Sequence, residues 1–205
     1  MTPGDAAREL PLFPLRAALF PDGLLELKIF EARYLDLMSR CLRERTPFGV
    51  VGLKAGREGK GAEAVELFDV GTTAELIDVD DTAAGILHVR CRGATRFSLG
   101  ATRTQADGLW LGVATPLDAD PVVAPSPSQA EIVKNLESAI AALAAQDVRP
   151  FLEPHRFDEA GWVANRWCEI LPLPLEARQR LLAMTDPLAR LDVVDSLMRV
   201  KADDH

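Results

Sequence analysis

The glycine-rich run from Gly56 to Gly61 is the part of the sequence that comes closest to a phosphate-binding loop. Such a loop needs a glycine, four further residues and then Gly-Lys-Ser/Thr, so that backbone amides surround the phosphates and the hydroxyl binds magnesium. Here Lys54 stands where the first glycine is required, and Gly61 stands where the hydroxyl is required. We therefore predict a flexible hairpin loop without nucleotide chemistry.

The residues that usually carry catalysis are not arranged for it. His88, His155 and His205 have no partner at metal-ligand spacing, and the sequence contains neither HExxH nor a Gly-x-Ser-x-Gly turn. Ser196 and Lys201 are five residues apart in a predicted helix, so their side chains point in different directions. The sequence therefore predicts no catalytic residue, no metal site and no cofactor.

Two charged clusters remain as candidate binding features. Asp78, Asp80 and Asp81 lack the central glycine and the later glutamate of a calcium loop, so we interpret them as a solvated turn. His88, Arg90 and Arg92 alternate along a predicted strand and share one face. This polyanion stripe could bind RNA, but on an acidic protein such a face is more often paired with neighbouring carboxylates.

The overall charge argues against nucleic acid and membrane partners. The chain has 23 Lys+Arg against 31 Asp+Glu, a formal net charge of −8, whereas nucleic acids and anionic membranes attract basic proteins. No signal peptide or membrane-span pattern is present. Cys41, Cys91 and Cys168 are widely spaced in apolar surroundings, which predicts buried, reduced thiols in a cytoplasmic protein.

Residues 1–120 have the pattern of a mostly antiparallel β domain with one helix. Apolar runs separated by glycine and aspartate turns predict strands at 25–29, 47–53, 70–79, 86–91, 95–99 and 109–115. The crowded segment from Leu10 to Phe20, which contains two prolines, predicts an edge strand that leads into a turn at Pro21-Asp22-Gly23. Helical spacing predicts one helix with a buried face of Phe30, Tyr34, Leu37, Cys41 and Leu42.

The rest of the chain has helical periodicity. Residues 116–127 contain four prolines and are predicted to be a linker. The helical bundle is assigned to 121–205, a range that includes the last part of this linker. Ser128 and Glu131 have capping-box spacing, and Asp186-Pro187 predicts the start of the last helix. Further helices are predicted from about 158 and over about 175–184. Strands followed by helices predict an α+β fold.

Several motifs are similar to one known family. LPLFPL at 10–15, LFPDG at 19–23 and L-x-L-x-IFEARY at 25–34 resemble the opening of the N-terminal domain of Lon proteases. The resemblance continues through VGTTA at 70–74, GILHVRCRG at 85–93 and LPLP at 171–174, and so covers nearly the whole chain. It implies a PUA-like β domain, with a six-stranded pseudo-barrel, joined to a helical bundle.

The same resemblance implies a function. In full-length Lon proteases this module contacts substrate polypeptides, and an ATPase and a Ser-Lys protease domain follow it. Neither has a counterpart in the sequence, so we expect a stand-alone, non-enzymatic module that binds polypeptide segments. Such binding needs an exposed apolar groove, which we expect where the β domain meets the bundle.

Three residues of the motif are candidate protein-binding residues, namely Glu31, Arg33 and Tyr34. The simpler interpretation, which we favour, is a local ion pair beside a packed aromatic ring. Two alternative functions stay open: RNA binding through His88, Arg90 and Arg92, and a small-molecule-binding regulatory domain. The sequence does not predict the identity of the partner or the oligomeric state.

Overall fold

The first part of the chain, with its alternating apolar and polar residues, forms six strands and one helix. The computed structural model describes residues 6–55, 65–83 and 85–203, with the backbone alone at 55, 81–83 and 200–203. The predicted loop at Gly56–Gly61 and His205 lie outside the described residues. The chain divides into two compact units, Met1–Asp118 and Ala119–His205.

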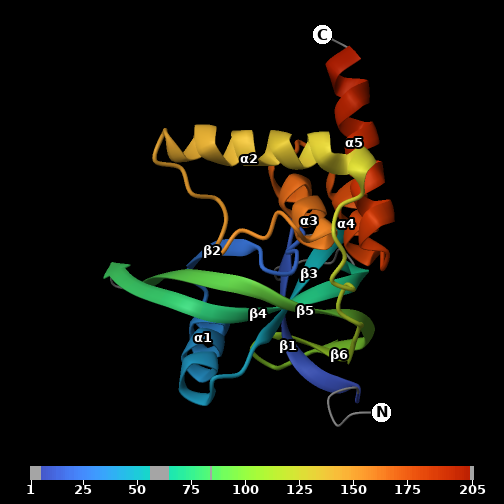
Figure 1. Ribbon diagram of the computed structural model, residues 1–205. Helices are drawn as coiled ribbons and strands as arrows, with labels where there is room; N and C mark the ends of the chain where they lie inside the picture. Colours follow the sequence, from blue (N-terminus) through green and yellow to red (C-terminus); the bar gives the residue numbers. More distant parts are fainter. Residues whose placement is uncertain (1–5, 56–64, 84, 204–205) are drawn as a thin grey trace. The chain divides into compact units, whose positions relative to one another are not determined.

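The β unit is one mixed sheet with the strand order β2-β5-β4-β3-β1-β6 (Figure 1). Its strands are β1 (Arg8–Leu15), β2 (Leu24–Ile29), β3 (Phe48–Ala55), β4 (Glu66–Ala83), β5 (Ile86–Thr104) and β6 (Trp110–Pro116). All pairs are antiparallel except β1 with β3. β5 pairs with β2 along its first part and with β6 along its last part, so the sheet closes on itself and β2 is left at an edge. The α+β prediction is confirmed.

The prediction of an edge strand at Leu10–Leu15 is wrong, because β1 lies between β3 and β6. Its two prolines nevertheless each have only one paired side. Pro11 lies opposite Leu111 of β6, before the pairing with β3 begins, and Pro14 lies opposite Val51 of β3, beyond the pairing with β6. Each proline is therefore paired with one neighbouring strand only. Its missing N–H does not deprive a second strand of a hydrogen bond.

Two predicted strands, 86–91 and 95–99, form the single strand β5. Gly93 lies between them, and any side chain there would overlap the carbonyl oxygen of Phe20. The turn at Pro21-Asp22-Gly23 is present and is bonded to this point: the Asp22 amide donates to the Gly93 carbonyl (2.7 Å), and the Gly93 amide donates to the Gly23 carbonyl (2.9 Å). Because Gly93 has no side chain, the turn can pack directly against β5 at this point, and the strand continues through the glycine.

Helix α1 (Ala32–Glu44) buries Tyr34, Leu37, Met38 and Cys41. The predicted buried face was wrong at two positions, since Phe30 is 67% exposed and Leu42 is 49% exposed. Phe30 precedes the helix and so does not follow its periodicity. Leu42 follows the buried Cys41 and is rotated from it by about 100° around the helix axis, which turns it away from the core. Met38 belongs to the buried face instead. In β2 the predicted alternation holds: Glu26 and Lys28 are exposed and Ile29 is buried.

The second unit consists of helices. They are η1 (Pro127–Gln129), α2 (Ala130–Ala144), α3 (Ala160–Ile170), α4 (Leu175–Ala183) and α5 (Pro187–Asp203). The capping box lies two residues before the predicted one: Ser126 caps and Gln129 bonds back to its amide (2.9 Å), because a 3-10 turn precedes α2. At α5 the prediction is confirmed, since the Asp186 carboxylate accepts from the amides of Leu188 and Ala189.

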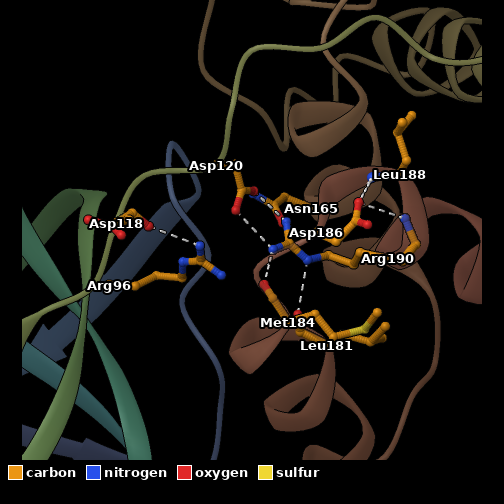
Figure 2. A network of polar contacts seen from close by, with 10 residues as sticks. Arg96, Asp118, Asp120, Asn165, Leu181, Met184, Asp186, Leu188 and Arg190 are labelled. Carbon is orange, nitrogen blue, oxygen red and sulfur yellow. Dashed lines mark hydrogen bonds and ion pairs between the residues drawn. The ribbon is translucent and has the colours of Figure 1, made fainter.

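Arg190 of α5 holds the helical unit together (Figure 2). It is 1% exposed, and its guanidinium donates to both carboxylate oxygens of Asp120 (2.6 and 3.1 Å) and to the side-chain oxygen of Asn165 (3.0 Å). It also donates to the carbonyls of Leu181 and Met184. All five N–H donors of the side chain are thereby used, which ties α3, the end of α4 and the segment before η1 to α5.

The three cysteines are buried and free, as predicted. Burial raises the pKa of the Cys41 thiol, and it raises the pKa of Cys91 and of Cys168 to about 12. These groups are therefore protonated at neutral pH, which makes them weak nucleophiles. Among the described helices, none has both the length and the apolar composition needed to cross a bilayer.

We predict that Arg190→Ala lowers the free energy of unfolding by about 3–5 kcal/mol, because it removes the buried guanidinium that bonds Asp120, Asn165 and two backbone carbonyls. Denaturant unfolding followed by the fluorescence of Trp162 and Trp167, both in the same unit, measures the change. The control is Arg199→Ala, which removes an exposed ion pair with Asp195 on the same helix and is expected to have little effect. Equal losses in the two variants would contradict the proposed role of Arg190.

Candidate functional site

A groove of about 220 Å³ opens where β1, β2 and the start of α1 meet. Seven of its nine lining residues are apolar or aromatic. β1 contributes Phe13, Pro14 and Leu15, β2 contributes Leu27, Lys28 and Ile29, and the chain beyond β2 contributes Phe30, Glu31 and Tyr34. The groove therefore presents mainly apolar surface, with one basic and one acidic side chain.

Tyr34 is the buried aromatic part of the groove. It is 2% exposed, and its ring stacks on Phe13 with the ring centroids 4.1 Å apart and the planes 28° from parallel. Phe13 in turn packs against Phe48 of β3. The Tyr34 hydroxyl is buried and has no hydrogen-bond partner among the described residues. A buried hydroxyl in this state costs about 1–3 kcal/mol, so the site holds an unused donor.

Phe30 is the exposed aromatic part of the groove. It lines the groove and is yet 67% exposed, because it lies between the end of β2 and the first residue of α1. A large aromatic side chain in water beside further apolar surface is typical of a binding site rather than of an ordinary surface position. Helical spacing predicted Phe30 to be buried, so its exposure beside the groove was not expected from the sequence.

Glu31 and Arg33 form the predicted local ion pair. The Arg33 guanidinium donates twice to one Glu31 carboxylate oxygen (2.8 and 3.1 Å) and once to the Gly108 carbonyl (2.6 Å). Gly108 has a φ of 86° in the turn between β5 and β6, so Arg33 joins the start of α1 to that turn. Its guanidinium also lies 4.8 Å from the centre of the Tyr34 ring.

The structure thus brings Glu31 and Tyr34 to the groove and places Arg33 behind it as a positioning residue. The ion pair and the packed ring that we favoured from the sequence are both present. Direct protein binding by Glu31, Arg33 and Tyr34 stays a prediction. So does the groove expected where the two parts of the chain meet.

The polyanion stripe of His88, Arg90 and Arg92 lies on β5 between two strands that carry carboxylates. Arg90 pairs with Glu26 of β2 (3.3 Å), and Arg92 pairs with Glu75 of β4 (2.8 Å), a hydrogen bond that raises the pKa of Arg92. On β4, Asp80 lies opposite His88. The stripe therefore forms part of a mixed-charge face. This is the arrangement favoured from the sequence for a basic face on an acidic protein, with carboxylates on the neighbouring strands.

The acidic cluster was predicted at a turn, and this was wrong. Asp78 and Asp80 lie inside β4, which continues to Ala83, and Asp78 is opposite Arg90 of β5. Arg90 and His88 of β5 lie opposite Asp78 and Asp80 in the register, and basic residues facing acidic ones favour strand pairing. In the part of the chain that the structure describes, no group of three His, Cys, Asp or Glu side chains is placed to hold a metal ion.

Two larger hollows are found among the described residues of the β unit. One, of about 430 Å³, covers the mixed-charge face and is lined mainly by charged side chains, Lys28, Asp78 and Asp80 among them. The other, of about 380 Å³, lies at the end of α1 beside Leu42, Arg45 and Leu76. Neither combines an exposed aromatic ring with an unpartnered buried hydroxyl, and for this reason the groove at Phe30 and Tyr34 is the stronger candidate.

Comparison with known proteins supports a shared fold and family. Residues 9–200 match the family model described as the ATP-dependent protease La (LON) substrate-binding domain. A Lon N-terminal domain protein from Xanthomonas campestris is 31% identical, with a TM-score of 0.73 over 92% of this chain and 98% of that one. The N terminal domain of Mycobacterium avium complex Lon protease is 15% identical, with a TM-score of 0.65 over 91% and 96%. No curated protein matches the sequence.

We predict that Arg33→Ala destabilises the β unit by about 1–2 kcal/mol, since it removes the bonds to Glu31 and Gly108 from a largely buried side chain. Thermal or denaturant unfolding, followed by the fluorescence of Trp110, measures the loss. Arg43→Ala on the same helix is the control, because Arg43 is exposed and pairs only with its neighbour Glu44 in the described structure. If Arg33→Ala is no less stable than Arg43→Ala, Arg33 does not position the helix.

Proposed function

Because the chain belongs to the family of LON substrate-binding domains, we propose that it recognises polypeptide segments and holds them in the groove between β1, β2 and α1. Membership of this family indicates that the chain is a substrate-recognition module, and the matched domain is itself non-catalytic. We further propose that the chain acts without an enzymatic activity of its own, and that it does so in the cytoplasm.

One observation carries the choice of site: Phe30 is 67% exposed at the rim of an apolar groove. Folded proteins bury most of their large apolar side chains, whereas unfolded segments expose them. Removing apolar surface from water contributes about 25 cal/mol per Å². A groove of this kind therefore favours unfolded or extended segments over folded surfaces.

The size of the groove bears on what it holds. Pockets for drug-sized molecules usually have volumes of roughly 300–1,000 Å³, whereas this groove has about 220 Å³. It fits one or two apolar side chains of a longer segment better than a whole cofactor. For this groove, the volume thus supports side chains of a polypeptide segment over a whole small molecule.

The RNA alternative gains little from the described residues. Its candidate stripe faces Glu26, Glu75 and Asp80 across the neighbouring strands, so phosphates would meet carboxylates as well as basic groups. The formal net charge of −8 adds to this repulsion. We therefore retain the polypeptide as the proposed partner.

We predict that Phe30→Ala weakens the binding of unfolded β-casein by about tenfold or more, because an exposed phenyl ring that becomes buried on binding contributes about 1.5–3 kcal/mol. Fluorescence anisotropy of labelled β-casein measures the affinity. Stability is expected to change little, since Phe30 is mostly exposed in the free protein.

The matched control is Val193→Ala, which removes a 41% exposed apolar side chain from α5. It is expected to leave the affinity unchanged. The proposal fails if the wild-type protein does not bind β-casein. It fails as a description of the site if Phe30→Ala and Val193→Ala have the same affinity as the wild type.

A further inference from the structure

We propose that the segment binds as an additional strand along the open edge of β2, and that it alternates apolar residues with acidic ones. This inference rests on the proposed function and specifies how the groove is used. Three observations carry it: the state of the β2 edge, the unpartnered Tyr34 hydroxyl and the charge of Lys28.

The β2 edge is a template for a further strand. β2 pairs with β5 on one side, over the whole of Leu24–Ile29 and without a bulge. On its other side, no backbone hydrogen bond joins these six residues to any part of the chain that the structure describes. Every second amide and carbonyl of such an edge points away from the sheet, available to an extended segment.

The edge and the groove are continuous. Leu27, Lys28 and Ile29 belong to both, as the last residues of β2 and as a wall of the groove. A strand laid along β2 keeps the two-residue period of the sheet, so alternate side chains follow the face of Leu27 and Ile29. Those side chains enter the groove, where Phe30 and Leu15 are available to cover them.

The Tyr34 hydroxyl indicates that the groove takes a polar group as well as apolar ones. The residue lines the groove, is 2% exposed, and its hydroxyl has no partner among the described residues. A backbone carbonyl of the incoming segment would give this hydroxyl the acceptor that it lacks. Apolar side chains alone could fill the groove, but they would leave the hydroxyl unsatisfied.

Lys28 sets the charge of the segment. Its side chain lies on the face of β2 opposite to Leu27 and Ile29, and no described carboxylate lies within ion-pair distance of it. By contrast, Glu26 on the same face is paired with Arg90. Asp78 and Asp80 line the same hollow as Lys28 but belong to β4, two strands away from the open edge. Opposite charges in directly facing strand positions stabilise a sheet, so an acidic residue of the new strand would lie beside Lys28.

The test uses a blocked heptapeptide, acetyl-Thr-Val-Glu-Val-Glu-Val-Thr-amide, titrated into the full chain and followed by NMR chemical shifts. Two isomers carry backbone N-methyl groups, one on the three valines and the other on the two glutamates. In an added strand, amides of one alternate set bond to β2 and amides of the other set face away. We expect one isomer to bind at least tenfold more weakly and the other to bind within about twofold of the parent.

Each outcome of this titration is decisive. Equal affinities for the two isomers would overturn strand addition, and the proposed function would survive if Phe30→Ala still weakened the parent peptide. If β-casein binds and the parent peptide does not, the alternating apolar and acidic class is wrong. If neither binds, the proposed function fails as well.

Two variants separate binding from structure. Tyr34→Phe is expected to weaken the binding of the parent peptide about fivefold without lowering stability, because the hydroxyl has no partner among the described residues of the free protein. If the hydroxyl had only a structural role, the substitution would lower stability and leave the peptide affinity unchanged. Lys28→Gln is expected to weaken the parent peptide but not its Gln-for-Glu analogue. Its control is Lys134→Gln, at an exposed position of α2. Equal effects of the two lysine variants would overturn the role of Lys28.

Discussion

The stacking of Tyr34 on Phe13 is the contact on which the candidate site depends. It joins the start of α1 to β1, two elements that are separated in the chain by β2 and its preceding turn. Both rings belong to the apolar cluster that also contains Phe48, Val89 and Cys91. Because the cluster buries one side of the groove, the groove cannot collapse without disturbing the core, and its position is fixed before any ligand arrives.

Features that depend on neighbours in the sequence were predictable. The alternation in β2, the Asp186 cap of α5 and the turn at Pro21-Asp22-Gly23 are local, and each is present. Features that depend on distant segments were not. β1 reads as an edge strand because of its prolines, yet it is enclosed by β3 and β6. Nothing within residues 8–15 reveals that the two pairings barely overlap along it.

The candidate site divides in the same way. Its motif residues Glu31, Arg33 and Tyr34 were found from the resemblance, and their local ion pair was predicted from their charges. The exposure of Phe30 was missed, because helical spacing extended the buried face one turn too far toward the N-terminus. The open edge of β2 was also missed, since the order of strands in a sheet follows from long-range pairing that periodicity does not encode.

The proposed function and the proposed added strand both place unfolded polypeptide on the β unit, at β2 and the adjoining groove. Amide hydrogen exchange, measured with and without saturating β-casein, tests this placement most directly, since added bonds along an edge slow exchange there. We expect slower exchange over Leu24–Ile29 and the first turn of α1 when β-casein is bound. Slower exchange confined to α2–α5 or to the paired strands β4 and β5, with Leu24–Ile29 unchanged, would contradict it.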